Sequence, residues 1–69
     1  MNPAIEHVLQ FFSYAHLPAD LQAVCVDFSK LANKVARQAD NAETTVALRK
    51  LLEAKDAAVR AVLLTRPKT

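Results

Sequence analysis

Apolar residues recur along this chain at the spacing of an α-helix. In the first segment they stand three or four positions apart, at Ile5, Val8, Leu9 and Phe12. This spacing puts them on one face of a helix, and Phe11 and Tyr14 lie off that face. Asn2 can cap the helix, and Pro3 suits its first position. The pattern predicts a first helix over residues 3–16.

A second helical pattern begins at the Leu17-Pro18 corner. The residue before a proline resists the helical conformation, whereas the proline itself can open a new helix. One apolar stripe follows, formed by Leu21, Val24, Cys25, Phe28, Leu31, Ala32 and Val35. Lys30, Lys34 and Arg37 lie toward its end, where positive charge favours the helix dipole. The pattern predicts a second helix over residues 18–39.

The next break is at residues 39–41. Asp40, followed three residues later by Glu43, has the form of a capping box. A third helix is predicted over residues 42–65, ending before Pro67. Because the connection is short, helices two and three are expected to be antiparallel neighbours. The sequence thus predicts a single all-α domain with a short N-terminal helix and an antiparallel two-helix hairpin.

The third helix carries more apolar surface than one neighbouring helix can cover. Its apolar arc spans roughly 200°, whereas about 100° suffices to pack one partner. The arc contains Ala47, Leu48, Leu51, Leu52, Ala54, Ala58, Val59, Ala61, Val62 and Leu63. A domain of 69 residues usually needs a disulfide, a metal or oligomerisation for stability. One cysteine cannot form a disulfide within the chain, and two histidines with it are too few for a structural metal site. A homo-oligomer is therefore predicted.

Charge and hydropathy exclude several classes of partner. The formal charge is +2, from nine basic and seven acidic residues, whereas a duplex-DNA-binding domain carries a strongly basic face. No apolar run approaches the roughly 20 residues of a membrane span. The first residues lack the basic start and apolar core of a signal peptide. A free cysteine without such a signal predicts a cytoplasmic protein.

The sequence offers little chemistry for catalysis. Cys25 lies on the apolar stripe of the second helix, where a cysteine is usually a small core residue. His7 and His16 stand nine residues apart and fall on different faces of the first helix. The chain has no glycine for a phosphate-binding loop and no Cys-x-x-Cys motif. It is therefore predicted not to be an enzyme and to use no cofactor or metal.

Arg49 and Arg60 lie on the polar side of the third helix. Arg49 with Glu53, and Asp56 with Arg60, have the i,i+4 spacing of helical ion pairs. One interpretation is a solvated face on which both weak pairs form. The other is that one arginine leaves its pair and holds a ligand phosphate, so Arg49 is a candidate ligand-binding residue.

Lys55 interrupts the apolar arc of the third helix. A buried lysine without a partner is costly because its charge loses its hydration. Three interpretations remain open. The ammonium pairs with a carboxylate of another helix, such as Asp20 or Asp27; the stem packs while the head reaches water; or the ammonium anchors a phosphate in a pocket between subunits.

Aromatic side chains gather before the Leu17-Pro18 corner, at Phe11, Phe12, Tyr14 and His16. Planar rings can stack on nucleobases for roughly 1–3 kcal/mol per base. The simpler interpretation makes the two phenylalanines core or interface residues, and leaves Tyr14 and His16 to face a pocket. A ligand with bases and phosphates would suit such rings next to a basic group: Lys30, Arg49 or Lys55.

Residues 12–24 and 45–61 resemble small phage and actinobacterial proteins with a helical-hairpin domain. That domain is similar to the one in phage-encoded anti-CBASS and anti-Thoeris nucleotide sponges. Tyr14-x-x-Leu17 resembles the sponge motif whose tyrosine stacks on a base. Arg49, with Leu52 and Glu53 after it, resembles the arginine-led pattern of the last helix. Lys30 stands one place from where the family pattern has a lysine.

The resemblance implies a compact helical homo-oligomer, hexameric in the sponges, that sequesters cyclic oligonucleotides in pockets between protomers. The leading hypothesis is therefore a cytoplasmic sponge for a cyclic di- or trinucleotide, which binds its ligand without turnover. It assigns base stacking to Tyr14, with His16 nearby, and phosphate contacts to Lys30, Arg49 and Lys55. No membrane or duplex DNA partner is expected.

Two other functions remain open. One is a non-catalytic interaction module, such as an adaptor or inhibitor, which would bind another protein through the apolar face of the third helix. A weak nucleic-acid binder would use Lys30, Lys34 and Arg37 and would show steep salt dependence. The low net charge makes the last function the least favoured.

Overall fold

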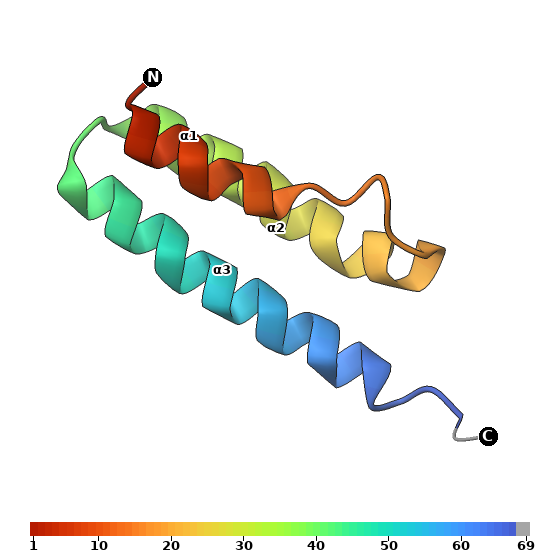
Figure 1. The fold of residues 1–69 in the computed structure, drawn as a ribbon. Helices are drawn as coiled ribbons and strands as arrows, with labels where there is room; N and C mark the ends of the chain where they lie inside the picture. Colours follow the sequence, from red (N-terminus) through yellow and green to blue (C-terminus); the bar gives the residue numbers. More distant parts are fainter. Residues whose placement is uncertain (68–69) are drawn as a thin grey trace.

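The computed structural model describes residues 1–67 as three α-helices and one short 3-10 helix (Figure 1). Helix α1 spans Pro3–Leu9 and is followed by the 3-10 helix η1, Gln10–Phe12. Helices α2, Ala19–Gln38, and α3, Ala42–Leu63, form an antiparallel hairpin. The predicted all-α class is confirmed for these residues. Both hairpin helices begin and end within two residues of their predicted ranges.

The first helix is shorter than predicted. The prediction of a helix over residues 3–16 is wrong, because regular helix ends at Leu9 and the 3-10 turn ends at Phe12. The Gln10 side chain contributes to this early end: its Nε2 donates to the His7 carbonyl at 2.9 Å. A side chain bonded to that carbonyl competes with the next turn of helix.

The loop after η1 carries Tyr14 and His16, which the sequence placed in the first helix. Ser13 leaves the helical conformation, with ψ at 140°. The Leu17 N–H then donates to the Tyr14 carbonyl at 3.0 Å and closes a turn. Gln22 holds this loop against α2, because its Nε2 donates to the Leu17 carbonyl at 2.8 Å. Tyr14 is half-buried there and His16 is exposed.

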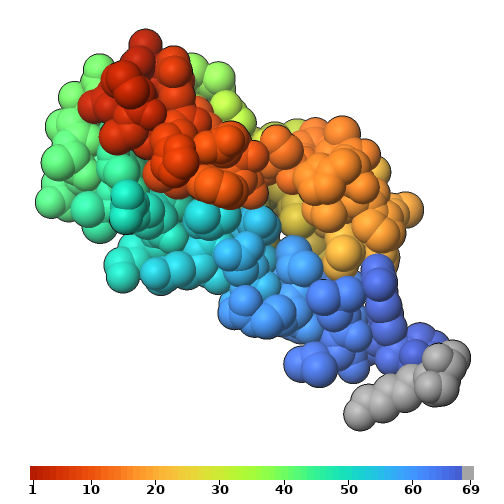
Figure 2. All heavy atoms as spheres, viewed as in Figure 1, coloured from red at the N-terminus to blue at the C-terminus, as the bar shows by residue number. Residues whose placement is uncertain are grey.

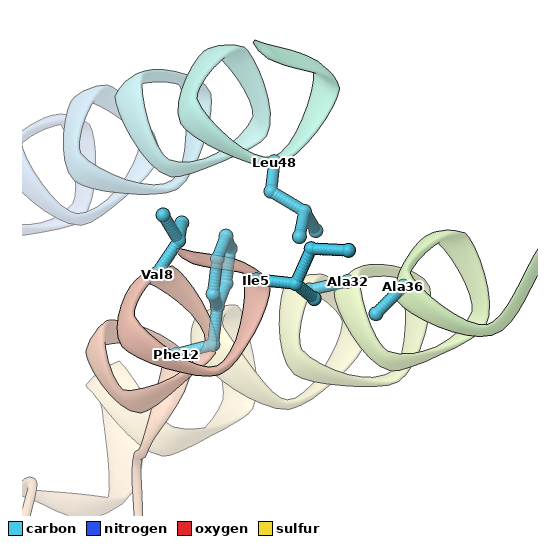
Figure 3. Packing of buried hydrophobic residues seen from close by; sticks show 6 residues of the cluster. All are labelled: Ile5, Val8, Phe12, Ala32, Ala36 and Leu48. Carbon is cyan, nitrogen blue, oxygen red and sulfur yellow. The ribbon is translucent and has the colours of Figure 1, made fainter. Parts of the chain in front are cut away.

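The core lies where the three helices meet, near the turn between α2 and α3 (Figure 3). It consists of Ile5, Val8, Phe12, Ala32, Ala36 and Leu48. The two alanines of α2 have short side chains, so the apolar side chains of α1 pack closely against that helix. The members from the first segment belong to its predicted apolar face, whereas Phe11 is 48% exposed. Cys25 is buried in α2, as predicted.

Asn41, not the predicted Asp40, caps α3. The Asn41 Oδ1 accepts a hydrogen bond from the Thr44 N–H at 3.2 Å, which satisfies one free donor of the first turn. The buried Thr44 hydroxyl donates to the Ala39 carbonyl at 2.8 Å. The capping position falls at residue 41 because its backbone is extended, at φ −154° and ψ 178°, immediately before the first helical residue.

At the end away from the core, α2 and α3 pack against each other without α1. Helix α1 covers only the half next to the α2–α3 turn (Figures 1 and 2). The molecule measures 46 × 19 × 15 Å. At the end away from the core, Arg66 Nη2 lies 2.7 Å from Asp20 Oδ1 and Arg66 Nε lies 3.0 Å from Asp20 Oδ2. This two-pronged ion pair connects the segment after α3 to the first turn of α2.

The Arg66–Asp20 pair is expected to make stability depend on pH in acid. Hydrogen bonds from Arg66 lower the pKa of the Asp20 carboxyl below its usual value of 3.8 in the folded chain. The ionised carboxyl stabilises the fold at any pH above its usual pKa. This contribution is lost as the pH falls through the lowered pKa of the folded chain. In urea unfolding, Arg66→Gln should be less stable than the native chain at neutral pH. At a pH well below 3.8 the variant and the native chain should be equally stable. A difference in stability that persists at that pH would contradict the Arg66–Asp20 pairing.

Candidate functional site

A shallow groove of about 260 Å³ lies between the N-terminal segment and α3. It is lined by His7, Val8, Phe11, Arg49 and Leu52. Val8 is buried and Leu52 is half-buried, whereas His7, Phe11 and Arg49 are exposed. Figure 2 shows the face on which the first segment lies against α3. The groove thus combines an apolar floor with one cation and two rings.

Hydrogen bonding and ring packing orient the two rings. His7 and Phe11 lie one helical turn apart, with ring centroids 5.5 Å apart and planes at 84°. Gln10 Nε2 lies 3.0 Å from His7 Nδ1 and also donates to the His7 carbonyl. An amide nitrogen only donates, so this contact fits the ring form in which Nδ1 accepts and Nε2 carries the proton. The free N–H of His7 is therefore available to a ligand.

Arg49 does not form the ion pair that its spacing predicts. Glu53 lies beside Lys50 instead, with 3.9 Å between Oε2 and Nζ. Asp56 pairs with Lys55, so the predicted bond to Arg60 does not form either. Within residues 1–67, Arg49 has no carboxylate partner. The interpretation of two i,i+4 pairs is wrong, and Arg49 presents an uncompensated guanidinium to the groove.

Lys55 pairs with its neighbour on α3. Its Nζ lies 2.9 Å from Asp56 Oδ1, and its side chain is only 15% exposed. The interpretation that a carboxylate of another helix neutralises Lys55 is wrong, because Asp20 is held by Arg66 and Asp27 forms no such bridge among the described residues. The stem of Lys55 packs in the apolar arc while its ammonium reaches the half-exposed Asp56.

The five residues predicted to bind ligand do not form one cluster. Arg49 lines the groove, while Tyr14 and His16 lie in the loop after η1. Lys30 is exposed in the middle of α2, and Lys55 is held in the apolar arc of α3. In the described part of the chain, none of these four lines the groove with Arg49.

Comparison with known proteins adds no relative. No family model, no curated protein and no solved structure matches this chain. The likeness to nucleotide sponges therefore stays a prediction from the residues that carry it. In residues 1–67, every helix is too short or too polar to cross a bilayer.

His7 and Phe11 are the groove residues that the sequence reasoning did not select. The sequence pattern gives His7 no partner in His16, and it favours Phe11 as a core or interface residue. Their i,i+4 spacing, off the apolar face of Ile5 and Val8, is a signal that both rings share an exposed side of α1 and η1. Their closeness to Arg49 depends on how α1 packs against α3, which spacing alone does not contain.

Proposed function

We propose that this chain binds a cyclic di- or trinucleotide and sequesters it without hydrolysis. In this proposal it is a cytoplasmic homo-oligomer that holds its ligands between protomers. One observation carries the proposal. In residues 1–67, Arg49 faces a groove without a carboxylate partner, beside the rings of His7 and Phe11.

Each part of the groove suits one part of a nucleotide. A guanidinium donates parallel hydrogen bonds to two oxygens of a phosphate, so Arg49 suits the phosphodiester. The exposed rings of His7 and Phe11 offer faces or edges on which a base can pack. The Nε2–H of His7 supplies one more donor. The proposal requires only binding, because stoichiometric sequestration involves no bond cleavage.

The size of the groove favours a ligand shared between copies. Its volume of about 260 Å³ is below the roughly 300–1,000 Å³ of pockets that bury a small molecule. A cyclic dinucleotide on one chain would therefore stay largely exposed, and a neighbouring protomer would have to supply a second wall. Tyr14, His16, Lys30 and Lys55, which lie outside the groove, are candidates for that wall.

Titration calorimetry against a panel of cyclic di- and trinucleotides tests the proposal. With micromolar protein, we expect binding heat for at least one ligand at a fixed ratio of ligand to chain. Mass spectrometry of the ligand released by heating should show it intact. The absence of heat across the whole panel, or release of a linear product, would overturn the proposal.

A protein-binding module is the second candidate, and exposed apolar side chains favour it. Leu31 on α2 and Leu64 after α3 are 47% and 82% exposed. Exposed apolar patches on a small chain are typical of protein-interaction surfaces. Affinity purification that recovers one stoichiometric protein partner and no nucleotide would favour this function over the first.

A further inference from the structure

The hairpin has an apolar surface on the side away from α1, which we call the open face. On α3, the first segment lies against Arg49 and Leu52, and at 3.6 residues per turn Ala54 projects from the opposite side. On α2, Ala32 and Ala36 belong to the core with α1. By this spacing the open face holds the exposed residues Leu31, Ala47, Ala54 and Ala61 and the half-buried residues Val24, Phe28, Val35, Leu51 and Ala58. Phe28, Val35 and Leu51 also pack against the core.

The open face is incompletely covered within one chain. Leu31 is 47% exposed, and it lines a hollow of about 230 Å³ together with Asp27 and Phe28. Three alanines of α3 are exposed at the other edge: Ala47, Ala54 and Ala61. Exposed apolar side chains that gather on one side of a small domain favour an interaction surface, because leaving them in water is unfavourable.

Two charges flank the open face on α2 and indicate what covers it. Asp27 and Lys34 are seven residues apart, which is close to two helical turns, so they share one edge of the helix. Leu31 lies between them. Both are exposed, and in residues 1–67 neither forms a salt bridge. The edge thus carries one negative and one positive charge, placed on either side of its midpoint.

We infer that the open face binds a second copy of this chain, with α2 packed antiparallel on α2 about a two-fold axis beside Leu31. In a two-fold contact, residue i meets j while j meets i. An axis midway between positions 27 and 34 puts Asp27 of each copy opposite Lys34 of the other. Parallel packing would instead place like charges together. The charge pattern therefore favours a second copy in antiparallel orientation.

Helix α3 adds small exposed side chains to the open face, at Ala47, Ala54 and Ala61, and small side chains at a contact allow close helix packing.

This interface requires no nucleotide, because it lies on the other side of the hairpin from the Arg49 groove. The groove stays open in the dimer and can meet further copies. Dimerisation of the nucleotide-free chain therefore tests the interface, while calorimetry on the native chain tests nucleotide binding. Either result can fail without the other.

Charge reversal at the two flanking positions tests the inference by sedimentation of nucleotide-free protein. Asp27→Lys and Lys34→Asp each replace two attractive pairs by two repulsive ones, and should raise the dimer dissociation constant about tenfold or more. The double variant restores both pairs and should dimerise like the native chain. An equimolar mixture of the two single variants should form heterodimers, because one chain presents two lysines and the other two aspartates.

Arg37→Asp is the matched control for Lys34→Asp, since it makes the same charge change on the same helix away from the open face. It should leave the dissociation constant unchanged, and circular dichroism should show equal helix content in all variants. A monomeric native chain, single reversals that dimerise normally, or a double variant no better than the single ones would each overturn the inference.

Discussion

Leu48→Ala is expected to lower the free energy of unfolding by about 2–5 kcal/mol. Leu48 is completely buried and packs with Ile5 and Phe12 between α1 and the hairpin (Figure 3). Its truncation leaves a cavity where all three helices meet. A chain of 69 residues has a total stability of roughly 3–10 kcal/mol, so this one change removes a large part of it.

Leu64→Ala serves as the matched control for this prediction. Leu64 is 82% exposed, and removing the same atoms there should change stability by no more than about 0.5 kcal/mol. Both variants should be unfolded in urea at one protein concentration, since association of copies adds to apparent stability. Equal losses for the two variants would mean that the core is not at Leu48.

Arg49→Ala is expected to weaken nucleotide binding more than any other single change in the groove. A hydrogen bond to a charged group contributes about 1.5–3 kcal/mol, so the dissociation constant should rise roughly tenfold to a hundredfold. Arg49→Lys keeps the charge but loses the paired donors. Its dissociation constant should therefore lie between those of Arg49→Ala and the native chain. Calorimetry with the tightest ligand of the panel measures all three.

Arg60→Ala is the control that distinguishes a local contact from general electrostatics. Arg60 is also exposed on α3 and does not line the groove, yet its removal changes the net charge equally. The affinity of Arg60→Ala for the nucleotide should stay within about twofold of that of the native chain, because exposed charges beyond a Debye length are screened. Equal weakening by both substitutions would show that Arg49 makes no direct contact with the phosphate.

The sequence predicts the helices well where a repeating pattern determines them. The spacing of Ile5, Val8 and Phe12 identifies the buried side of the first segment, and the same reasoning places Cys25 in the core. The end of the first helix depends on one side-chain contact, from Gln10 to the His7 carbonyl. Such a contact has no periodic signature, so the predicted end at residue 16 lies seven residues after the end of α1 at Leu9.

The candidate site was less predictable because it depends on the packing of separate helices. Helical spacing paired Arg49 with Glu53, but Glu53 lies beside Lys50, three residues before it. Spacing also selected Arg49 without showing that His7 would share its groove. Whether His7 lies next to Arg49 depends on the register between α1 and α3. Helical spacing within each segment does not determine that register.

Both the proposed binding between protomers and the open-face interface rest on one physical claim. The folded chain retains apolar surface that only another copy covers. Sedimentation velocity of nucleotide-free protein over a range of concentrations tests this claim most directly. The expected result is a helical species of at least twice the chain mass of 7.6 kDa. A well-folded species that remains at 7.6 kDa at the highest concentration would contradict it.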